Sequence, residues 1–252
     1  MAATVAELTG PARQRYVADL FARISGHYDL MNDVITLGMH RGWKRRTAAL
    51  ATQALQGPAL DVSTGTGDLA FQLARRPGVN STVGLDLLPE MIALAQGRAI
   101  RKKADTVRLM LGDALSLPFP NGTFACATAG FSLRNMPDVR QAVGEMARVV
   151  QPGGRVALLE LSPMETGVKA RLFRLYFHGV VPLVGNLIAR DRAAYTYLPQ
   201  SVDRFYDANE LATMLREAGL ENVGYRRLGF GTVCLHWGDK PLIRSGDGNS
   251  TL

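Results

Sequence analysis

Acidic residues flank a glycine-rich turn in the segment ALDVSTGTGDLA, residues 59 to 70. Asp61 precedes Gly65 and Gly67, and Asp68 follows them, within the spacing G-x-G-x-x-A that is typical of dinucleotide-binding turns. A pyrophosphate in such a turn would bind at the N-terminus of the following helix, close to both carboxylates. A like-charge pair about 4 Å apart costs roughly 4 kcal/mol near a protein surface. We therefore predict a ligand without phosphate groups.

S-adenosylmethionine (SAM) meets that condition, and it carries a sulfonium and an ammonium group. Asp61 would hold these cations while the two glycines let the backbone approach closely. Asp86, 21 residues after the first glycine, can accept both hydroxyls of a ribose, which serves a nicotinamide cofactor equally well. Asp113 can accept from an adenine amino group, and the N–H of Ala114 can donate to the ring. Each acid alone can cap a helix or turn, but four acids at the ends of three consecutive strands favour the methyl donor.

Strand-like runs alternate with helical patterns through the middle of the chain. The runs cover residues 59–62, 81–85, 107–111, 123–128 and 155–161, and the helices cover 69–75, 89–102 and 139–150. This alternation is typical of βαβ units, so we predict an α/β, Rossmann-like fold with a largely parallel sheet. The motif QPGG, residues 151–154, is expected to end the third helix and begin the fifth strand.

The last two strand-like runs, residues 223–230 and 232–237, follow a helix at 209–218 and are separated by one glycine. They can only pair as a hairpin, so one of them must be antiparallel in the sheet. Between them and the fifth strand, residues 164–206 have helical spacing and are predicted to form a lid insertion. We expect a single domain over residues 1–243, with an N-terminal helical cap at 11–55 and a disordered tail at 244–252.

Composition limits the classes of function. The chain has 252 residues, 47% of them apolar, which is enough for a full core. A formal charge of +7 indicates an anionic partner, either nucleic acid or a membrane surface. Cys126 and Cys234 lie in apolar runs, and the four histidines are scattered, so we expect buried thiols in a cytoplasmic setting and no metal site. No apolar stretch reaches the length of a membrane span or resembles a signal peptide.

Three segments are specific enough to indicate a family. They are YDLMNDVITLGMHRGWK (28–44), LPFPNGTFACATAGFSLRN (117–135) and RVVQPGGRVALLELS (148–162). They resemble the signatures of the demethylmenaquinone and 2-polyprenyl-benzoquinol C-methyltransferases, the UbiE/MenG group of class I methyltransferases, and the resemblance covers about residues 16–240. It implies a seven-stranded sheet with an antiparallel last strand. It also implies that SAM is the cofactor.

The resemblance places donor contacts at Thr66, Asp86, Asp113 and Ala114. Leu87, beside the ribose-binding acid, and Gly130, at the end of the fourth strand, complete the predicted donor set together with Asp61, Gly65 and Gly67. Many members of the family have serine or alanine in place of Gly130, so a side-chain contact at that position is absent here. Gln151 replaces the usual lysine before PGG, and Thr36 replaces a serine.

Methylation of a ring carbon requires a reduced quinol that loses a hydroxyl proton. Each unit by which a nearby cation or base lowers the pKa of that hydroxyl represents about 1.4 kcal/mol. Arg134 is predicted to stabilise the quinolate and Asn135 to orient the ring oxygen, roles that the resemblance supports. Tyr28, His40 and His178 are candidate proton acceptors or relays, although a lone histidine is more often a packed structural residue. The favoured reaction converts demethylmenaquinol to menaquinol. Methylation of a 2-methoxy-6-polyprenyl-benzoquinol in ubiquinone biosynthesis stays open.

A polyprenylated quinol lives in the bilayer, which gives the basic charge and the apolar insertion a shared explanation. We expect peripheral association with an anionic membrane at its inner face, through Arg171, Arg174, Arg190 and Arg192; a lid that does not touch membrane is the alternative. A nicotinamide-dependent reductase remains a rival on the evidence of the glycine turn and Asp86. An RNA methyltransferase is disfavoured, because GFSLRN stands where an NPPY-type motif would be. A homodimer is the family-level expectation.

Overall fold

A seven-stranded sheet forms the centre of the molecule. The computed structural model describes residues 10–163, 167–189 and 192–242. The strands are β1 (Gly57–Val62), β2 (Val79–Asp86), β3 (Val107–Leu111), β4 (Phe124–Gly130), β5 (Val150–Leu161), β6 (Glu221–Leu228) and β7 (Val233–Asp239). Their order is β3-β2-β1-β4-β5-β7-β6, and β7 runs antiparallel to both of its neighbours. The predicted mixed sheet with one antiparallel last strand is confirmed.

Strand β4 explains why the sheet is covered on both faces. Its sequence, FACATAG, is buried at every residue except the terminal Gly130. Small side chains on both faces let helices pack closely on either side, as is usual for central parallel strands. Both cysteines are buried in the sheet, Cys126 in β4 and Cys234 in β7, as expected from their apolar surroundings.

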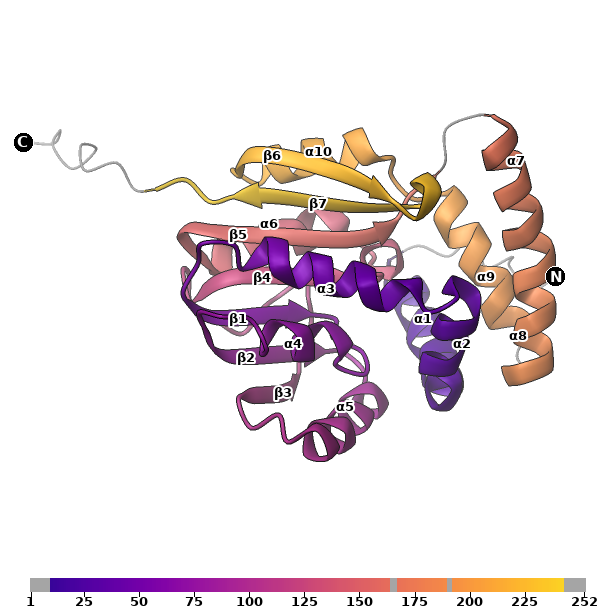
Figure 1. The fold of residues 1–252 in the computed structure, drawn as a ribbon, viewed down its shortest axis with the longest axis horizontal. Helices are drawn as coiled ribbons and strands as arrows, with labels where there is room; N and C mark the ends of the chain where they lie inside the picture. The colour runs from indigo at the N-terminus through magenta and orange to yellow at the C-terminus, as the bar shows by residue number, and fades with distance from the viewer. Residues whose placement is uncertain (1–9, 164–166, 190–191, 243–252) are drawn as a thin grey trace, which may run out of the picture.

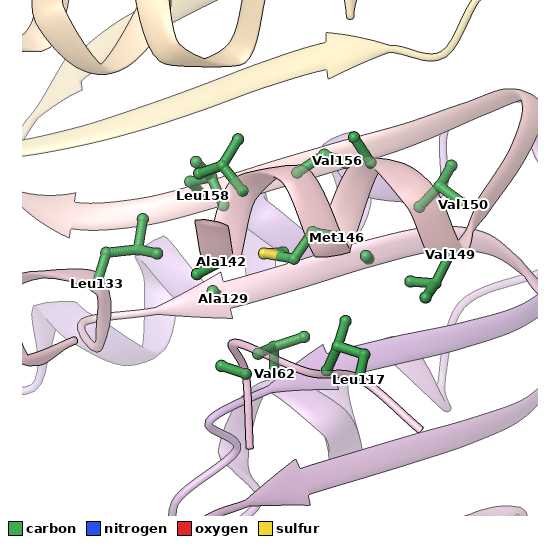
Figure 2. Close-up of a cluster of buried hydrophobic side chains, with 14 of the residues drawn as sticks. Val62, Leu117, Ala129, Leu133, Ala142, Met146, Val149, Val150, Val156 and Leu158 are labelled. Atoms are coloured by element: carbon green, nitrogen blue, oxygen red, sulfur yellow. The ribbon is translucent and has the colours of Figure 1, made fainter. Parts of the chain in front are cut away.

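Helices form a layer on each face of the sheet. On one face lie α3 (Met39–Ala51), α4 (Asp68–Leu73) and α5 (Pro89–Lys102), and on the other lie α6 (Val139–Val149) and α10 (Ala208–Glu217) (Figure 1). Figure 2 shows Ala142, Met146 and Val149 of α6 among the side chains of β4, β5 and the segment after β3. Helix α10 begins with a capping box, in which Asp207 and Glu210 each bind the other's backbone N–H.

Most element ends shift by one or two residues from the sequence prediction, and two connections differ in kind. The motif QPGG lies inside β5, which begins at Val150 immediately after α6, and the register of β5 against β4 shifts there. A Cβ on Gly154 would lie 2.5 Å from the carbonyl oxygen of Ala125, so only glycine permits this close approach. The final hairpin is also longer than the single predicted glycine. It turns through Gly229–Gly231 and Thr232, with Phe230 at a φ of 58°.

A second group of helices lies beyond the carboxyl ends of the parallel strands (Figure 1). It combines α1 (Gly10–Ile24) and α2 (Tyr28–Thr36) with three helices that we call the insertion helices: α7 (Val168–Leu175), α8 (Val181–Ala189) and α9 (Arg192–Asp203). These elements share a hydrophobic core of their own, which is built around buried residues such as Leu20, Met31, Phe177 and Tyr195. None of the helices in the described part of the chain is long and apolar enough to cross a bilayer.

Candidate active site

A cavity opens at the carboxyl ends of β1, β2 and β4, where the strand order reverses. Its empty volume, part of which is open to solvent, is about 780 Å³. Ligands bind at this position in open α/β sheets, because adjacent loops there diverge to opposite sides. The cavity is lined by the ends of the strands (Ser63, Gly65, Asp86, Leu87, Leu88, Asp113, Ala114, Leu115, Gly130, Phe131, Ser132), by Met91, by Asn135 to Pro137, and by Val17, Ala18, Phe21 and Tyr28 of the N-terminal helices. We call it the donor cavity.

Asp86 is fixed at the mouth of this cavity by backbone donors. Its Oδ2 accepts from the N–H of Gly65 at 2.8 Å and its Oδ1 from the N–H of Leu88 at 3.0 Å. Burial raises the pKa of Asp86, and its backbone hydrogen bonds oppose that rise. Gly65 adopts a φ of 56°, which brings the turn against the carboxylate. Each carboxylate oxygen keeps a second lone pair, so the group can still accept from two hydroxyls.

Asp113 is the second acid that lines this cavity. Its Oδ1 accepts from the N–H of Leu115 at 2.9 Å, which fixes the acid after β3. Leu87 and Met91 add apolar side chains to the lining. Gly130, at the end of β4, also lines the cavity, and an added Cβ there would lie 3.3 Å from Leu69.

Three residues predicted to touch the donor are absent from the described residues that line the cavity. Asp61 is buried and accepts from the hydroxyls of Thr64, at 2.6 Å, and Thr128, at 2.8 Å. Burial raises its pKa to about 6, against the lowering effect of these hydrogen bonds. Thr66 donates to Asp29 at 2.7 Å, and Gly67, at a φ of 86°, begins α4. These three residues stabilise the glycine turn without lining the cavity.

Asp68 is neutralised by two cations, which corrects the electrostatic argument made from the sequence. It pairs with Lys44 at 2.9 Å and with Arg98. Burial alone would raise the pKa of Asp68, but Lys44 and Arg98 outweigh burial and lower it to about 2. The carboxylate is therefore ionised but compensated, so it would repel a pyrophosphate little. The acids that line the donor cavity are Asp86 and Asp113.

A second cavity adjoins the first and is mainly apolar. Its empty volume is about 790 Å³, again including open space. The two cavities share Phe21, Tyr28, Phe131 and Asn135. Its other walls come from α1 to α3, the turn after β4, the end of β5, and the insertion helices with the turn that joins α7 to α8 (Leu20, Ile24, Met31, Asn32, Ile35, Thr36, His40, Lys44, Arg134, Leu161, Phe177, Ala194, Tyr195, Tyr197, Leu198). We call it the acceptor cavity.

Arg134 and Asn135 both reach the acceptor cavity, and both are already held by protein partners. The guanidinium of Arg134 donates to the carbonyl of Phe131 at 2.7 Å and pairs with the buried carboxylate of Glu160. Asn135 accepts a hydrogen bond from the hydroxyl of Tyr197 at 3.2 Å. The cation is therefore fixed at the wall of the cavity, while the insertion helices orient the amide.

The structure brings Tyr28 and His40 to the acceptor cavity but not His178. Tyr28 packs edge-on against Phe21 and lines both cavities. His40 is 4% exposed, and its Nε2 lies 2.8 Å from Asp33 Oδ1. His178 lies on the outside of the insertion, 42% exposed and paired with Asp203, so the structure does not support it as a proton relay.

Sequence reasoning missed the acidic partners of these groups. Glu160 lies within an otherwise apolar strand, VALLEL, and an acid in a buried strand is a signal that could have been used. Asp33 is seven residues before His40, and the helix breaks between them at Leu37 and Gly38. Helical spacing therefore gave no sign that these two residues meet.

The sheet order and the cavity at its switch point are those of the class I SAM-dependent methyltransferase fold. A SAM-dependent methyltransferase from Thermotoga maritima has the same fold, with a TM-score of 0.63 over 89% of this chain and 99% of its own, at 17% identity. The model of the ubiE/COQ5 methyltransferase family matches residues 9–240, and the chain belongs to this family. The resemblance predicted from the three sequence segments is thus confirmed.

Curated relatives cover most of the chain. The demethylmenaquinone methyltransferase of Deinococcus radiodurans is 43% identical over 224 residues, which are 89% of this chain and 92% of the relative. The ubiquinone/menaquinone biosynthesis C-methyltransferase UbiE of Roseobacter denitrificans is 37% identical over 225 residues, 89% of this chain and 90% of the relative. The chain therefore spans nearly the full length of both.

Proposed function

We propose that this protein transfers a methyl group from SAM to a ring carbon of demethylmenaquinol, forming menaquinol. The observation that carries the proposal is the pair of adjoining cavities, one lined by two acids at the strand ends and the other apolar, with four residues in common. A methyl donor in the first cavity and an apolar ring in the second would therefore lie next to each other, beside the four residues that the cavities share. The more similar relative is named for demethylmenaquinone, which favours that ring over a benzoquinol.

Residues of the donor cavity fit SAM. Asp86 would accept the ribose hydroxyls, Asp113 and the N–H of Ala114 would bind the adenine, and Leu87 would cover its face. When bound, SAM supplies an electrophilic methyl group on a sulfonium. The backbone at Gly65 and Gly130 leaves room for the chain that carries the sulfonium. Asp61, Thr66 and Gly67 would act indirectly by holding the turn in place.

Residues of the acceptor cavity fit a quinol that must develop negative charge. Arg134 would stabilise the oxygen anion from the wall, and its pairing with Glu160 keeps the guanidinium in place. Asn135 would orient the ring oxygen through its amide N–H₂, because its carbonyl oxygen already accepts from Tyr197. Tyr28 lies at the junction of the cavities, where it can hold the ring against the donor.

Two measurements test the proposal. Calorimetric titration with S-adenosylhomocysteine and with NADH separates the methyltransferase from the rival reductase. Incubation with SAM and a chemically reduced demethylmenaquinone should give a product heavier by one CH₂ unit on mass spectrometry, because the methyl group replaces a ring hydrogen. A parallel incubation with a 2-methoxy-6-polyprenyl-benzoquinol measures the ring preference. Tight NADH binding without S-adenosylhomocysteine binding would overturn the proposal.

We also propose that the insertion docks on an anionic membrane. A π-helical turn at Tyr176–Val180 joins α7 to α8, so residues 168–189 form one continuous helix. Its inner side packs in the hydrophobic core that the insertion helices share with α1 and α2. Four apolar side chains on its outer side are nevertheless 44 to 72% exposed (Leu175, Val180, Leu183, Leu187). Arg171 and Arg174 are exposed near its start. Exposed leucines beside arginines are typical of interfacial helices.

Flotation with vesicles tests this docking. We expect binding to phosphatidylglycerol-containing vesicles at low salt, weaker binding at high salt, and loss of binding in the double variant Leu183→Asp/Leu187→Asp. Ile100→Asp is the matched control, because Ile100 is an exposed apolar residue of similar size on α5, outside the insertion. This variant should bind vesicles as the wild type does. No flotation of the wild type at either salt concentration would remove the proposal. Arg190 lies outside the described residues, as does the side chain of Arg192.

A further inference from the structure

His40 is a buried residue that lines the acceptor cavity, and it pairs with the half-buried Asp33 behind it. The Nε2 of His40 lies 2.8 Å from Oδ1 of Asp33, and the ring is 4% exposed. The other ring nitrogen, Nδ1, is fully buried and has no hydrogen-bond partner among the described residues. A buried polar atom without a partner is costly, so it needs an explanation in a native site. A bound ligand that donates a proton to Nδ1 would supply that partner.

The Asp33 carboxylate determines which ring nitrogen is free to act as a base. A carboxylate accepts from Nε2–H, so the neutral ring carries its proton on Nε2 and presents a lone pair at Nδ1. Arg41 binds the second oxygen of Asp33 from the exposed side. The hydrogen bonds from His40 and Arg41 lower the pKa of Asp33 and outweigh the opposing effect of burial. The carboxylate therefore stays ionised and can stabilise a protonated ring.

The other polar groups of this cavity are poorly suited to remove a proton. Arg134 is a permanent cation, and Asn135 is a neutral amide. Lys44 also lines the cavity, but its ammonium group is paired with Asp68. Tyr28 would have to lose its own proton first. Among the described residues of the wall, His40 is the one whose neutral side chain presents a basic nitrogen lone pair.

We infer that His40, positioned by Asp33, is the general base that takes the hydroxyl proton of the acceptor. The inference rests on the proposed quinol substrate. The O–H bond breaks, Nδ1 gains the proton, and the oxygen electrons raise the electron density of the ring. A carbon–carbon bond then forms to the methyl group as the carbon–sulfur bond breaks, leaving a neutral thioether. The ring carbon loses its hydrogen to water as a proton, and His40 returns its proton to the oxygen.

Protonation of His40 should make the activity decline at low pH, a part of the pH profile that we call the acid limb, and the charges around His40 set its position. Burial lowers the pKa of His40 and the charge of Lys44 adds to this fall, while the hydrogen bond that His40 donates to Asp33 and the charge of Asp68 oppose it. Arg134 is the remaining charged group of the described residues around this cavity. The histidine therefore stays neutral below its ordinary pKa of about 6.5. Activity should fall only when the pH drops below that value.

Nitrogen NMR of the protein labelled with ¹⁵N-histidine tests the inference without turnover. We expect the His40 Nδ1 resonance to be that of an unprotonated nitrogen, and to move upfield when 4-methoxy-1-naphthol is added. 1,4-Dimethoxynaphthalene has the same ring but no hydroxyl proton, so it should not move the resonance. A resonance that ignores both probes, or a protonated Nδ1 in the free protein, would overturn the inference.

Kinetics supply the second readout. His40→Gln should lower kcat by about 10²- to 10⁴-fold and abolish the acid limb. Asp33→Asn should lower kcat with little change in KM and move the limb to lower pH. His178→Gln removes an exposed histidine that is also paired with an aspartate, and it should behave as wild type. Unchanged binding of S-adenosylhomocysteine shows that the variants are folded.

The kinetic results distinguish a failure of the proposed function from a failure of the assignment of His40 as the base. If the wild type does not methylate demethylmenaquinol, the proposed function fails. If the wild type is active and His40→Gln keeps its kcat and its acid limb, the function stands and the assignment of the base is wrong.

Discussion

Asp86 shows how one side chain can serve both the fold and a ligand. Two backbone N–H groups already fill one lone pair on each carboxylate oxygen. In Asp86→Asn, the amide N–H₂ would face one of these donors, and the charge would be lost. We expect S-adenosylhomocysteine to bind about 10- to 100-fold more weakly, equivalent to about 1.4–2.8 kcal/mol.

Calorimetric titration checks this expectation. Asp105→Asn is a suitable control, because Asp105 is exposed in the loop before β3 and distant from the cavity lining. Equal binding by Asp86→Asn and wild type would show that the ribose is held elsewhere.

His236 predicts a dependence of stability on pH. It is 1% exposed in β7, its Nε2 lies 2.9 Å from the carbonyl of Ala208, and burial lowers its pKa to about 4. Between pH about 6.5 and 4 the unfolded chain binds this proton and the folded chain does not. The free energy of unfolding therefore falls as the pH drops through that window, by on the order of 3 kcal/mol from this residue.

Urea unfolding of wild type and His236→Gln across that pH range measures the effect. The wild type should lose stability relative to the variant as the pH drops through this window, because glutamine can donate to the same carbonyl but does not titrate. The raised pKa of Asp61 gives a slope of opposite sign in both proteins, so the difference between them is the relevant quantity. Parallel curves would contradict the prediction.

At the scale of elements, a chain of charged groups joins the N-terminal helices to the sheet layer. Arg98 of α5 donates to Asp29 of α2 and to Thr66 of the glycine turn, both at 2.7 Å, and it also pairs with Asp68. Lys44 of α3 completes the chain through Asp68. Four helices and the turn are thus held together by one guanidinium and its partners.

Arg98→Met should loosen this connection. The variant keeps the apolar stem but leaves Asp29 and Thr66 without their cation, so we expect a loss of about 1–3 kcal/mol of stability and faster amide exchange in α1 and α2. Arg101→Met, an exposed position on the same helix, should have little effect. Unaltered exchange in α2 would show that its apolar contacts suffice.

Patterns of single elements were largely predictable, and contacts between elements were not. Helix α5 occupies the predicted residues 89–102 because Pro89 begins it and its apolar spacing is regular. Asp86 ends β2 and Asp113 follows β3, and both strands end at one edge of the sheet, so these two acids could be placed together. Asp68 could not be judged from its spacing, because its cations come from α3 and α5. Side chains that neutralise one another across elements leave no periodic signal.

At the scale of the whole molecule, the donor cavity is lined both by the central sheet and by the separate group of helices that contains α1. The sheet supplies Asp86 and Gly130, and helix α1 supplies Val17, Ala18 and Phe21. Ligand binding should therefore stabilise α1 against the sheet, since anything that binds the assembled form favours it.

Hydrogen exchange measured with and without S-adenosylhomocysteine checks this coupling. Exchange in residues 10–24 should slow on binding, whereas exchange in α10, which packs on the opposite face of the sheet, should not change. Slowing confined to the strand ends would indicate that α1 does not close on the ligand.

The helix formed by residues 168–189 is apolar on two opposite sides, with Phe177 in the wall of the acceptor cavity and leucines exposed on the outside. If it rests on the bilayer as proposed, an isoprenoid chain can stay in hydrocarbon while only its head group enters the protein. Extracting each methylene into water would cost about 0.8 kcal/mol, and this route avoids that cost. Capture of the head group then becomes independent of how many isoprene units follow it.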